Sequence, residues 1–192
     1  MATGNENKVR EIREMLEGSE LEIVSMKAAG ISADIDENGT TFEENAVIKA
    51  ETIRDITGTV VLADDSGLEI DYLGGGPGVH SARFMGEDTS YDIKNAAILS
   101  KLDGVPEEKR SARFICAMAI AYPDAPTKVF KGVFEGRIAE KKAGENGFGY
   151  DPIFYVPECG CTSAELPPEE KNSMSHRGKA LKAAAAELLK LK

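Results

Sequence analysis

The sequence predicts an α/β fold, in which strands and helices are interspersed along one chain. Two observations support this class. Segment 59–63 is short and, after Thr59, wholly apolar, which is typical of a strand buried between layers of helices. Segment 41–56 opens with Thr41 and Glu44, which have the spacing of a helix capping box. No proline- or serine-rich linker divides the 192 residues, so we expect a single domain over 1–192.

Four helices are expected. Val9, Ile12 and Leu16 fall on one face of the first, and Gly18 follows as a stop. Gly58 ends the second helix. The last is rich in alanine, leucine and lysine, which are strong helix formers. The four segments are 6–16, 41–56, 90–102 and 180–191.

Four strands are expected between these helices. The apolar strand 59–63 leads directly into Asp64. Two longer runs follow one another closely and look like paired strands. The four segments are 21–26, 59–63, 113–122 and 128–138.

Charge and composition exclude several classes of function. Acidic residues number 33 and basic residues 23, and the sequence has no basic stretch that could neutralise the phosphates of a nucleic-acid polymer. No apolar run approaches the ~20 residues of a membrane span, and no charged-then-apolar leader opens the chain. Cys116, Cys159 and Cys161 are too few for a disulfide framework, and the last two lack the two-residue spacer of common zinc knuckles. We therefore expect a cytoplasmic protein with free thiols and no membrane partner.

Asp64 and Asp65 begin the most informative motif, Asp-Asp-Ser-Gly. They follow the predicted apolar strand, and open α/β sheets bind ligands at the carboxyl ends of strands. Adjacent carboxylates repel and are unfavourable near a core unless a cation or a proton balances them. A polar turn, in which either carboxylate caps backbone amides, would also explain the motif.

Two further segments suit charged ligands. Segment 34–39 imitates the first half of a calcium-binding EF-hand loop, but its twelfth position is Asn45 instead of Glu. It could still give one carboxylate, such as Glu37, to a metal, and a solvated loop is the alternative. In segment 3–8, the amides of a helix start together with Lys8 suit a phosphate, and an ordinary helix cap is the alternative.

Aromatic residues and hydrogen-bond donors gather in two later segments. Segment 147–152 places Phe148, Tyr150 and one carboxylate in a tight loop. Exposed rings could stack on a base, whereas burial in a core would explain the same pattern. Segment 170–179 collects donors before the last helix, and a serine-capped helix with solvated charges is its alternative.

Taken in order, six motifs resemble one family. They are Thr-Gly-Asn-x-x-Lys at 3–8, Glu-Asn-Ala-x-x-Lys at 44–49, Ala-Asp-Asp-Ser-Gly-Leu at 63–68, Pro-Gly-Val-x-Ser-Ala-Arg at 77–83, Phe-Gly-Tyr-Asp-Pro at 148–152 and Ser-His-Arg-Gly-Lys-Ala-Leu at 175–181. This succession resembles the inosine triphosphate pyrophosphatase family of the Ham1 type, and it covers nearly the whole chain. The combination is specific, although each motif alone is common.

The resemblance implies a long mixed β-sheet flanked by helices, two lobes with a central cleft, and usually a homodimer. It implies Mg²⁺-dependent hydrolysis of ITP, dITP and XTP to the monophosphate and pyrophosphate, which clears deaminated purines from the nucleotide pool. The sequence departs from the family pattern at one place. Only Met1 and Ala2 precede Thr3, where the family has a short apolar strand.

The resemblance also implies roles for individual residues. Glu37 and Asp65 would hold the metal, and Asp65 would accept the proton of the attacking water. His176 and Arg177 would read the purine edge. The residues implied in substrate binding are Thr3, Gly4, Asn5, Glu6, Asn7, Lys8, Lys49, Ser66, Phe148, Gly149, Tyr150, Asp151, Lys171, His176 and Arg177.

Three alternatives stay open. The first is a Maf-like pyrophosphatase that acts on modified pyrimidine nucleotides, against which the Ser-His-Arg and Phe-Gly-Tyr-Asp motifs argue. The second is a nucleotide-binding protein without catalysis, against which the intact Asp64–Asp65 pair argues. The third is a structural α/β domain without a ligand, which leaves the ordered motifs unexplained.

Overall fold

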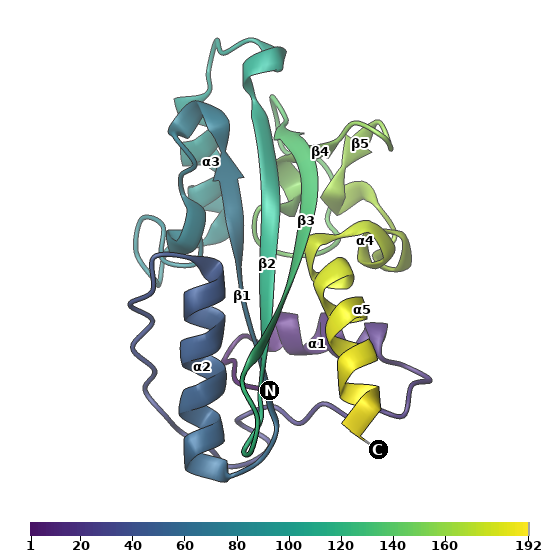
Figure 1. Ribbon diagram of the computed structural model, residues 1–192. Coiled ribbons are helices and arrows are strands. Elements are labelled where there is room, and N and C mark those ends of the chain that lie inside the picture. The colour runs from purple at the N-terminus through teal and green to yellow at the C-terminus, as the bar shows by residue number, and fades with distance from the viewer. Residues whose placement is uncertain (192) are drawn as a thin grey trace. The chain divides into compact units, whose positions relative to one another are not determined.

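The computed structural model describes residues 1–191 and divides them into two compact units. Unit 1 comprises residues 1–66, 116–132 and 176–191, and unit 2 comprises residues 67–115 and 133–175. A five-stranded sheet has the order β1-β2-β3-β4-β5 (Figure 1). The sheet is accompanied by five α-helices, so the expected α/β class is confirmed.

Three long strands contribute residues to both units. They are β1 (Val61–Ile70), β2 (Ser111–Ala121) and β3 (Lys128–Ile138). The pair 113–122 and 128–138 was expected, and both strands form close to those bounds. β3 pairs antiparallel with β4 (Phe154–Val156), and β4 pairs antiparallel with β5 (Cys161–Thr162).

Strand β1 corrects one expectation about the Asp-Asp motif. The sequence predicted that the strand would end before Asp64, but β1 continues to Ile70. Leu68 and Ile70 are fully buried, so apolar burial resumes beyond the acidic pair and sustains the strand. The two carboxylates therefore project from the middle of a strand, where the backbone is held on a regular path.

Unit 1 contains helices α1 (Glu6–Met15), α2 (Phe42–Thr57) and α5 (His176–Leu188). The capping box forms as expected at the start of α2, and Gly58 ends that helix in the left-handed conformation with φ 65°. Figure 1 shows α2 on one side of the strands of unit 1 and α5 on the other. Helices α1 and α5 bury an apolar face against β1 and β2; this cluster includes Ile12, Leu16, Leu62, Met118, Ile120, Leu181 and Ala184.

Helix α5 begins at His176, earlier than the expected start at 180. His176 and Arg177 therefore lie in its first turn instead of in a preceding loop. Gly132 on β3 makes this close approach possible, because a Cβ built there would lie 2.0 Å from the His176 carbonyl oxygen.

Unit 2 contains helices α3 (Tyr91–Lys101) and α4 (Pro168–Met174). Helix α3 forms close to the expected bounds 90–102, and Ser90 caps it, with its side chain accepting from the Ile93 amide. Helix α4 and the short strands β4 and β5 were not expected, since each is too short to show a clear periodicity. The core of unit 2 includes Leu68, Ile70, Ile98, Leu102, Phe114, Phe134, Ile153 and Phe154.

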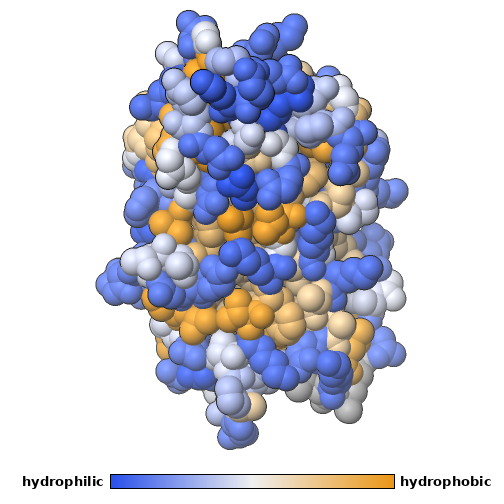
Figure 2. Space-filling view, turned by 45° about the horizontal axis from the view of Figure 1, so that its top comes forward, coloured by the Kyte–Doolittle hydropathy of each residue, from blue (hydrophilic) through white to orange (hydrophobic). Residues whose placement is uncertain are grey.

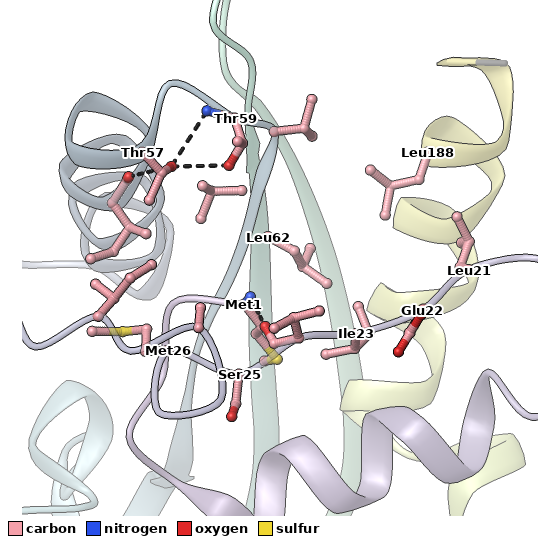
Figure 3. Close-up of a pocket in the computed structure, with 16 residues that line it drawn as sticks. Met1, Leu21, Glu22, Ile23, Ser25, Met26, Thr57, Thr59, Leu62 and Leu188 are labelled. Atoms are coloured by element: carbon pink, nitrogen blue, oxygen red, sulfur yellow. Dashed lines mark hydrogen bonds between the residues drawn. The ribbon is translucent and has the colours of Figure 1, made fainter.

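The expected strand at 21–26 does not form in the described residues. This segment instead forms one wall of an apolar groove of about 390 Å³ in unit 1 (Figure 3). Met1 lies between Leu62 and Ile23, and its terminal amine donates to Val24 O at 2.6 Å. Ala2 N donates to Leu62 O at 2.8 Å. The first two residues thus link segment 21–26 to β1 without forming a strand themselves.

The surface mixes polar and apolar side chains. Figure 2 shows a face on which polar residues predominate and apolar areas lie between them. Scattered apolar exposure of this kind is normal for folded chains. Across residues 1–191, no helix is both long enough and apolar enough to cross a membrane.

Candidate active site

Lys49 joins the acidic loop to the Asp-Asp motif within unit 1. Its Nζ lies 2.9 Å from Glu37 Oε2 and 2.9 Å from Asp65 Oδ1. Lys49 comes from α2 and is 7% exposed, and Asp65 comes from β1 and is 8% exposed. One ammonium group therefore holds two carboxylates that are distant in sequence. The structure brings together three of the residues that the resemblance implies in the site.

Asn45 supports the same cluster, and the sequence had not indicated it as a functional residue. Its Nδ2 lies 3.4 Å from Asp65 Oδ2, and its Oδ1 accepts from Gly39 N at 2.8 Å. Asn45 is 1% exposed, on the buried face of α2. It ties the end of the acidic loop to Asp65. The one available signal was a polar residue at a buried position of a capped helix.

Asp64 forms a second buried cluster in unit 1. Its Oδ2 lies 2.9 Å from Lys8 Nζ and 3.7 Å from Arg177 Nε, and its side chain is fully buried. Asp64 Oδ1 has no hydrogen-bond partner among the described residues. A buried carboxylate oxygen without a partner is unfavourable, so this oxygen is available to a ligand.

The two adjacent carboxylates have opposite pKa shifts. Burial opposes ionisation of Asp64, but Lys8 and Arg177 outweigh it and lower its pKa to about 2. Burial raises the pKa of Asp65, although Lys49 and Lys8 oppose that shift. Asp64 therefore carries a firm negative charge, whereas Asp65 binds a proton more readily than an ordinary aspartate.

The segment 3–8 leads into α1 as expected. Asn5 caps the helix, and its side-chain oxygen accepts from Asn7 N at 3.0 Å and from Lys8 N at 3.3 Å. Thr3 Oγ1 accepts from Asn5 N at 3.2 Å. Gly4 has open space where a side chain would stand. The cap places Lys8 so that it reaches Asp64, while Glu6 and Asn7 are exposed.

Arg177 is held by three groups of unit 1. Its Nη1 lies 2.5 Å from Glu11 Oε2, its Nη2 donates to Ser66 Oγ at 3.0 Å, and its Nε faces Asp64. Arg177 is 2% exposed. Burial opposes its charge, but Glu11 and Asp64 outweigh burial and raise its pKa. The sequence did not indicate Glu11, because it lies off the face of α1 that Val9, Ile12 and Leu16 form, and only the structure shows that it is buried.

The remaining expected residues, Phe148, Gly149, Tyr150, Asp151 and Lys171, lie in unit 2. Lys171 Nζ lies 2.7 Å from Asp151 Oδ2, and both side chains are buried. The same oxygen accepts from Phe148 N at 2.8 Å, and the Phe148 ring lies 5.4 Å from the Lys171 ammonium. Asp151 thus fixes a loop amide, an aromatic residue and a lysine together.

Tyr150 and Gly149 are positioned by residues that the sequence did not single out. Tyr150 is buried and its hydroxyl donates to Ser81 O at 2.8 Å. Asn95 Nδ2 donates to Gly149 O at 3.1 Å, and the Tyr91 ring meets the Tyr150 ring edge-on at 5.2 Å. Tyr150 therefore serves the core of unit 2, which was the alternative interpretation of this motif.

The carboxylates of unit 1 fit a divalent cation by their chemistry. Glu37 and Asp65 share Lys49 as a positive partner. Asp64 has a buried oxygen, Oδ1, with no hydrogen-bond partner among the described residues. Mg²⁺ prefers such oxygen ligands and uses one or two protein carboxylates. No group of three or more His, Cys, Asp or Glu side chains is arranged to enclose an ion in the part of the chain that the structure describes. Mg²⁺ commonly fills the rest of its coordination shell with phosphate oxygens and water, so two protein carboxylates suffice.

Comparisons with known proteins identify the family of the chain. The Ham1 family model matches residues 1–187. A dITP/XTP pyrophosphatase of Bacillus licheniformis is 53% identical over 187 residues, covering 97% of this chain and 95% of that protein. A dITP/XTP pyrophosphatase of Bacillus subtilis is 48% identical over 182 residues, covering 95% and 92%.

Solved structures have the same fold. A Ham1 protein from Coxiella burnetii is 41% identical, with a TM-score of 0.88 over 98% of this chain and 96% of that chain. The Ham1 protein of Staphylococcus aureus is 40% identical, with a TM-score of 0.88 over 100% and 97%. From these matches along its length, together with the six ordered motifs, the chain belongs to the Ham1 family.

Proposed function

We propose that this protein hydrolyses the non-canonical purine nucleotides ITP, dITP and XTP to the monophosphate and pyrophosphate. The activity is that of the dITP/XTP pyrophosphatases to which the chain is similar. One observation in unit 1 carries the proposal. Lys49 binds Glu37 and Asp65 at equal distances, beside a second aspartate that is bound by Lys8. Lysine side chains paired with carboxylates in this way suit a metal-assisted attack of water on a phosphate anhydride.

Asp65 is the general base of the proposed reaction. Its Oδ1 accepts from Lys49, while the contact of its Oδ2 with Asn45 is long at 3.4 Å. Oδ2 is therefore the oxygen better able to take a proton from water. Burial raises the pKa of Asp65, which makes it a stronger base than an exposed aspartate. Asp64 remains charged beside it and orients Lys8.

Glu37 and Asp65 would hold Mg²⁺, because both offer carboxylate oxygens around one shared positive partner. When bound, Mg²⁺ polarises phosphoryl oxygens and offsets part of the triphosphate charge. The chain adds charge of its own, since Lys8 and Lys49 lie beside these carboxylates. Nearby charges act more strongly than distant, screened ones, so a chain of net charge −10 can still bind a polyanion here.

Phosphate and base contacts complete the proposal. Segment 3–8 offers backbone amides at the start of α1, which suit a phosphate. Lys171 is proposed to bind phosphate, and Phe148, Gly149 and Asp151 are proposed to shape a base site. The buried Tyr150 would contribute by anchoring this loop in the core of unit 2. His176 and Arg177 are proposed to read the purine edge. Arg177 offers only donors, which match the oxygen at C6 of hypoxanthine and xanthine and oppose the amino group of adenine.

Metal, assembly and location are the finer features of the proposed function. We propose Mg²⁺ as the cofactor, a homodimer as the assembly and the cytoplasm as the location. The metal is supported by the oxygen chemistry of Glu37 and Asp65. The dimer is tested by the molar mass in solution, measured by light scattering at several protein concentrations.

A single assay tests the function. Pyrophosphate and orthophosphate release are measured from ITP, XTP, dITP, GTP, ATP and dUTP, with Mg²⁺ and with EDTA. The expected result is pyrophosphate from the first three nucleotides, lost in EDTA. Preference for a pyrimidine nucleotide would favour a Maf-like enzyme instead. Binding of ITP without release of any product would indicate a nucleotide-binding protein that has no catalytic activity.

A further inference from the structure

Three sulfur-bearing side chains pack against the same core cluster of unit 2. Cys159 precedes Gly160 in the turn after β4, Cys161 is the first residue of β5, and Met174 is the last residue of α4. Cys159 Sγ lies 3.9 Å from Met174 Sδ. All three side chains are half-buried and pack against the same apolar core. They therefore gather where solvent still reaches them, and the proposed pyrophosphatase activity uses none of them.

The backbone holds the two cysteines in a defined turn. Cys159 N and Gly160 N both donate to Val156 O, at 3.1 Å and 3.0 Å. Val156 is also the antiparallel partner of Cys161. Gly160 has φ 70°, a conformation that other residues rarely adopt. The two cysteines are thus held two residues apart on a tight hairpin.

The distance between the sulfurs of Cys159 and Met174 matches that of two ligands sharing one metal ion. Metal–sulfur bonds of thiolate sites are about 2.3 Å, so two sulfurs on one ion at trigonal or tetrahedral angles are about 3.8–4.0 Å apart. The distance between Cys159 Sγ and Met174 Sδ falls in this range. Thiolate and thioether ligands are soft and select Cu(I), whereas Mg²⁺ and Ca²⁺ select oxygen.

Negative charge around the cluster favours a cation. The carboxylates of Glu158 and Glu170 act electrostatically on Cys159, and those of Glu165 and Glu170 act on Cys161. Their negative charge attracts a positive ion to the same place.

We propose that Cys159, Cys161 and Met174 form a binding site for a soft monovalent ion of the Cu(I) class. Each thiol loses its proton to solvent as its sulfur–metal bond forms, and the Met174 thioether donates a lone pair without losing a proton. The ion stays monovalent, so no electron is exchanged. The spacing of the two cysteines does not suit a common zinc knuckle, and the structure supplies a third ligand from a different element.

Competition for Cu(I) tests the proposal. The reduced full-length chain is titrated with Cu(I) against a chromogenic Cu(I) chelator, without oxygen. One equivalent is expected to bind, and Met174→Leu is expected to weaken binding about tenfold, with a loss of about 100-fold in Cys159→Ser and in Cys161→Ser. Met15→Leu and Cys116→Ala are matched controls, because they change a core-packed methionine and a buried thiol of unit 1. Both controls are expected to keep the affinity of the unmodified protein.

Two readouts separate metal binding from folding. Thermal denaturation of each metal-free variant shows that its fold is kept, and X-ray absorption of the unmodified protein with Cu(I) needs no variant. An ion surrounded by sulfur alone supports the site. Unchanged affinity in Met174→Leu, loss of binding in Cys116→Ala, or nitrogen or oxygen neighbours around the ion would overturn the proposal.

Discussion

Glu11 Oε2 and Arg177 Nη1 lie 2.5 Å apart and join the first helix to the last within unit 1. Both side chains are almost fully buried. Removing one member of a buried ion pair leaves the other charge in an apolar surrounding. Glu11→Gln is therefore expected to lower the free energy of unfolding by about 3 kcal/mol, measured by urea denaturation.

The matched control for this pair is Glu14→Gln on the same helix. Glu14 lies 4.0 Å from Arg10, and both side chains are well exposed. Exposed ion pairs contribute about 0–1 kcal/mol, so the control should change stability little. Equal losses in Glu11→Gln and Glu14→Gln would contradict a special role of the buried pair.

Asp65→Asn is expected to abolish turnover while ITP still binds. The amide keeps the size of the side chain but cannot accept the proton of water, and a general base contributes about 100-fold or more. Turnover is measured by pyrophosphate release and binding by calorimetry. Asp71→Asn is the control, since Asp71 is an exposed aspartate directly after the same strand. Near-normal turnover in Asp65→Asn would remove Asp65 as the base.

Arg177→Ala is expected to narrow the preference for ITP over ATP. Loss of a group that has only donors removes both the match to the C6 oxygen and the conflict with the adenine amino group, a difference of about tenfold or more. The ratio of kcat/KM for the two nucleotides is the measurement. Lys179→Ala, at an exposed position of the same helix, should leave the ratio unchanged. An unaltered ratio in Arg177→Ala would exclude Arg177 from base recognition.

Cys116 is expected to make stability depend on alkaline pH. Burial raises its pKa to about 12 from an ordinary value of 9.0, so the folded chain keeps a proton that the unfolded chain releases. Its contribution is fully present below pH 9.0 and is lost as pH rises toward about 12, at about 1.4 kcal/mol per pH unit. Urea denaturation from pH 8 upward should show this slope, and Cys116→Ala should reduce it. Parallel curves for the two proteins would contradict the shift.

Gly132→Ala is expected to displace the start of α5. The new Cβ would lie 2.0 Å from His176 O and 2.8 Å from Ala180 N, so strand and helix must separate. Such overpacking destabilises by about 1–3 kcal/mol. The thermal midpoint is the measurement, and Gly4→Ala is the control because nothing lies within 4 Å of the position that its new Cβ would take. An unchanged midpoint in Gly132→Ala would show that the helix can shift freely.

Local sequence determined the elements with clear ends. Asn5, the Thr41–Glu44 capping box and Ser90 each satisfy backbone amides close by in the chain, so their helices begin where the sequence predicts. The motifs also determined the family, because their order does not depend on any contact. The prediction of a strand at 21–26 was wrong, because an extended segment becomes a strand only when a neighbouring strand pairs with it.

Only the tertiary structure decided the partners of the charged residues. Lys49 meets Glu37 and Asp65, and Arg177 meets Glu11, across separations that no local pattern encodes. Burial then sets the opposite pKa shifts of the adjacent Asp64 and Asp65, which have the same intrinsic chemistry. The sequence specifies which residues are charged, but the energies of their interactions depend on the distances and solvent exposure that folding imposes.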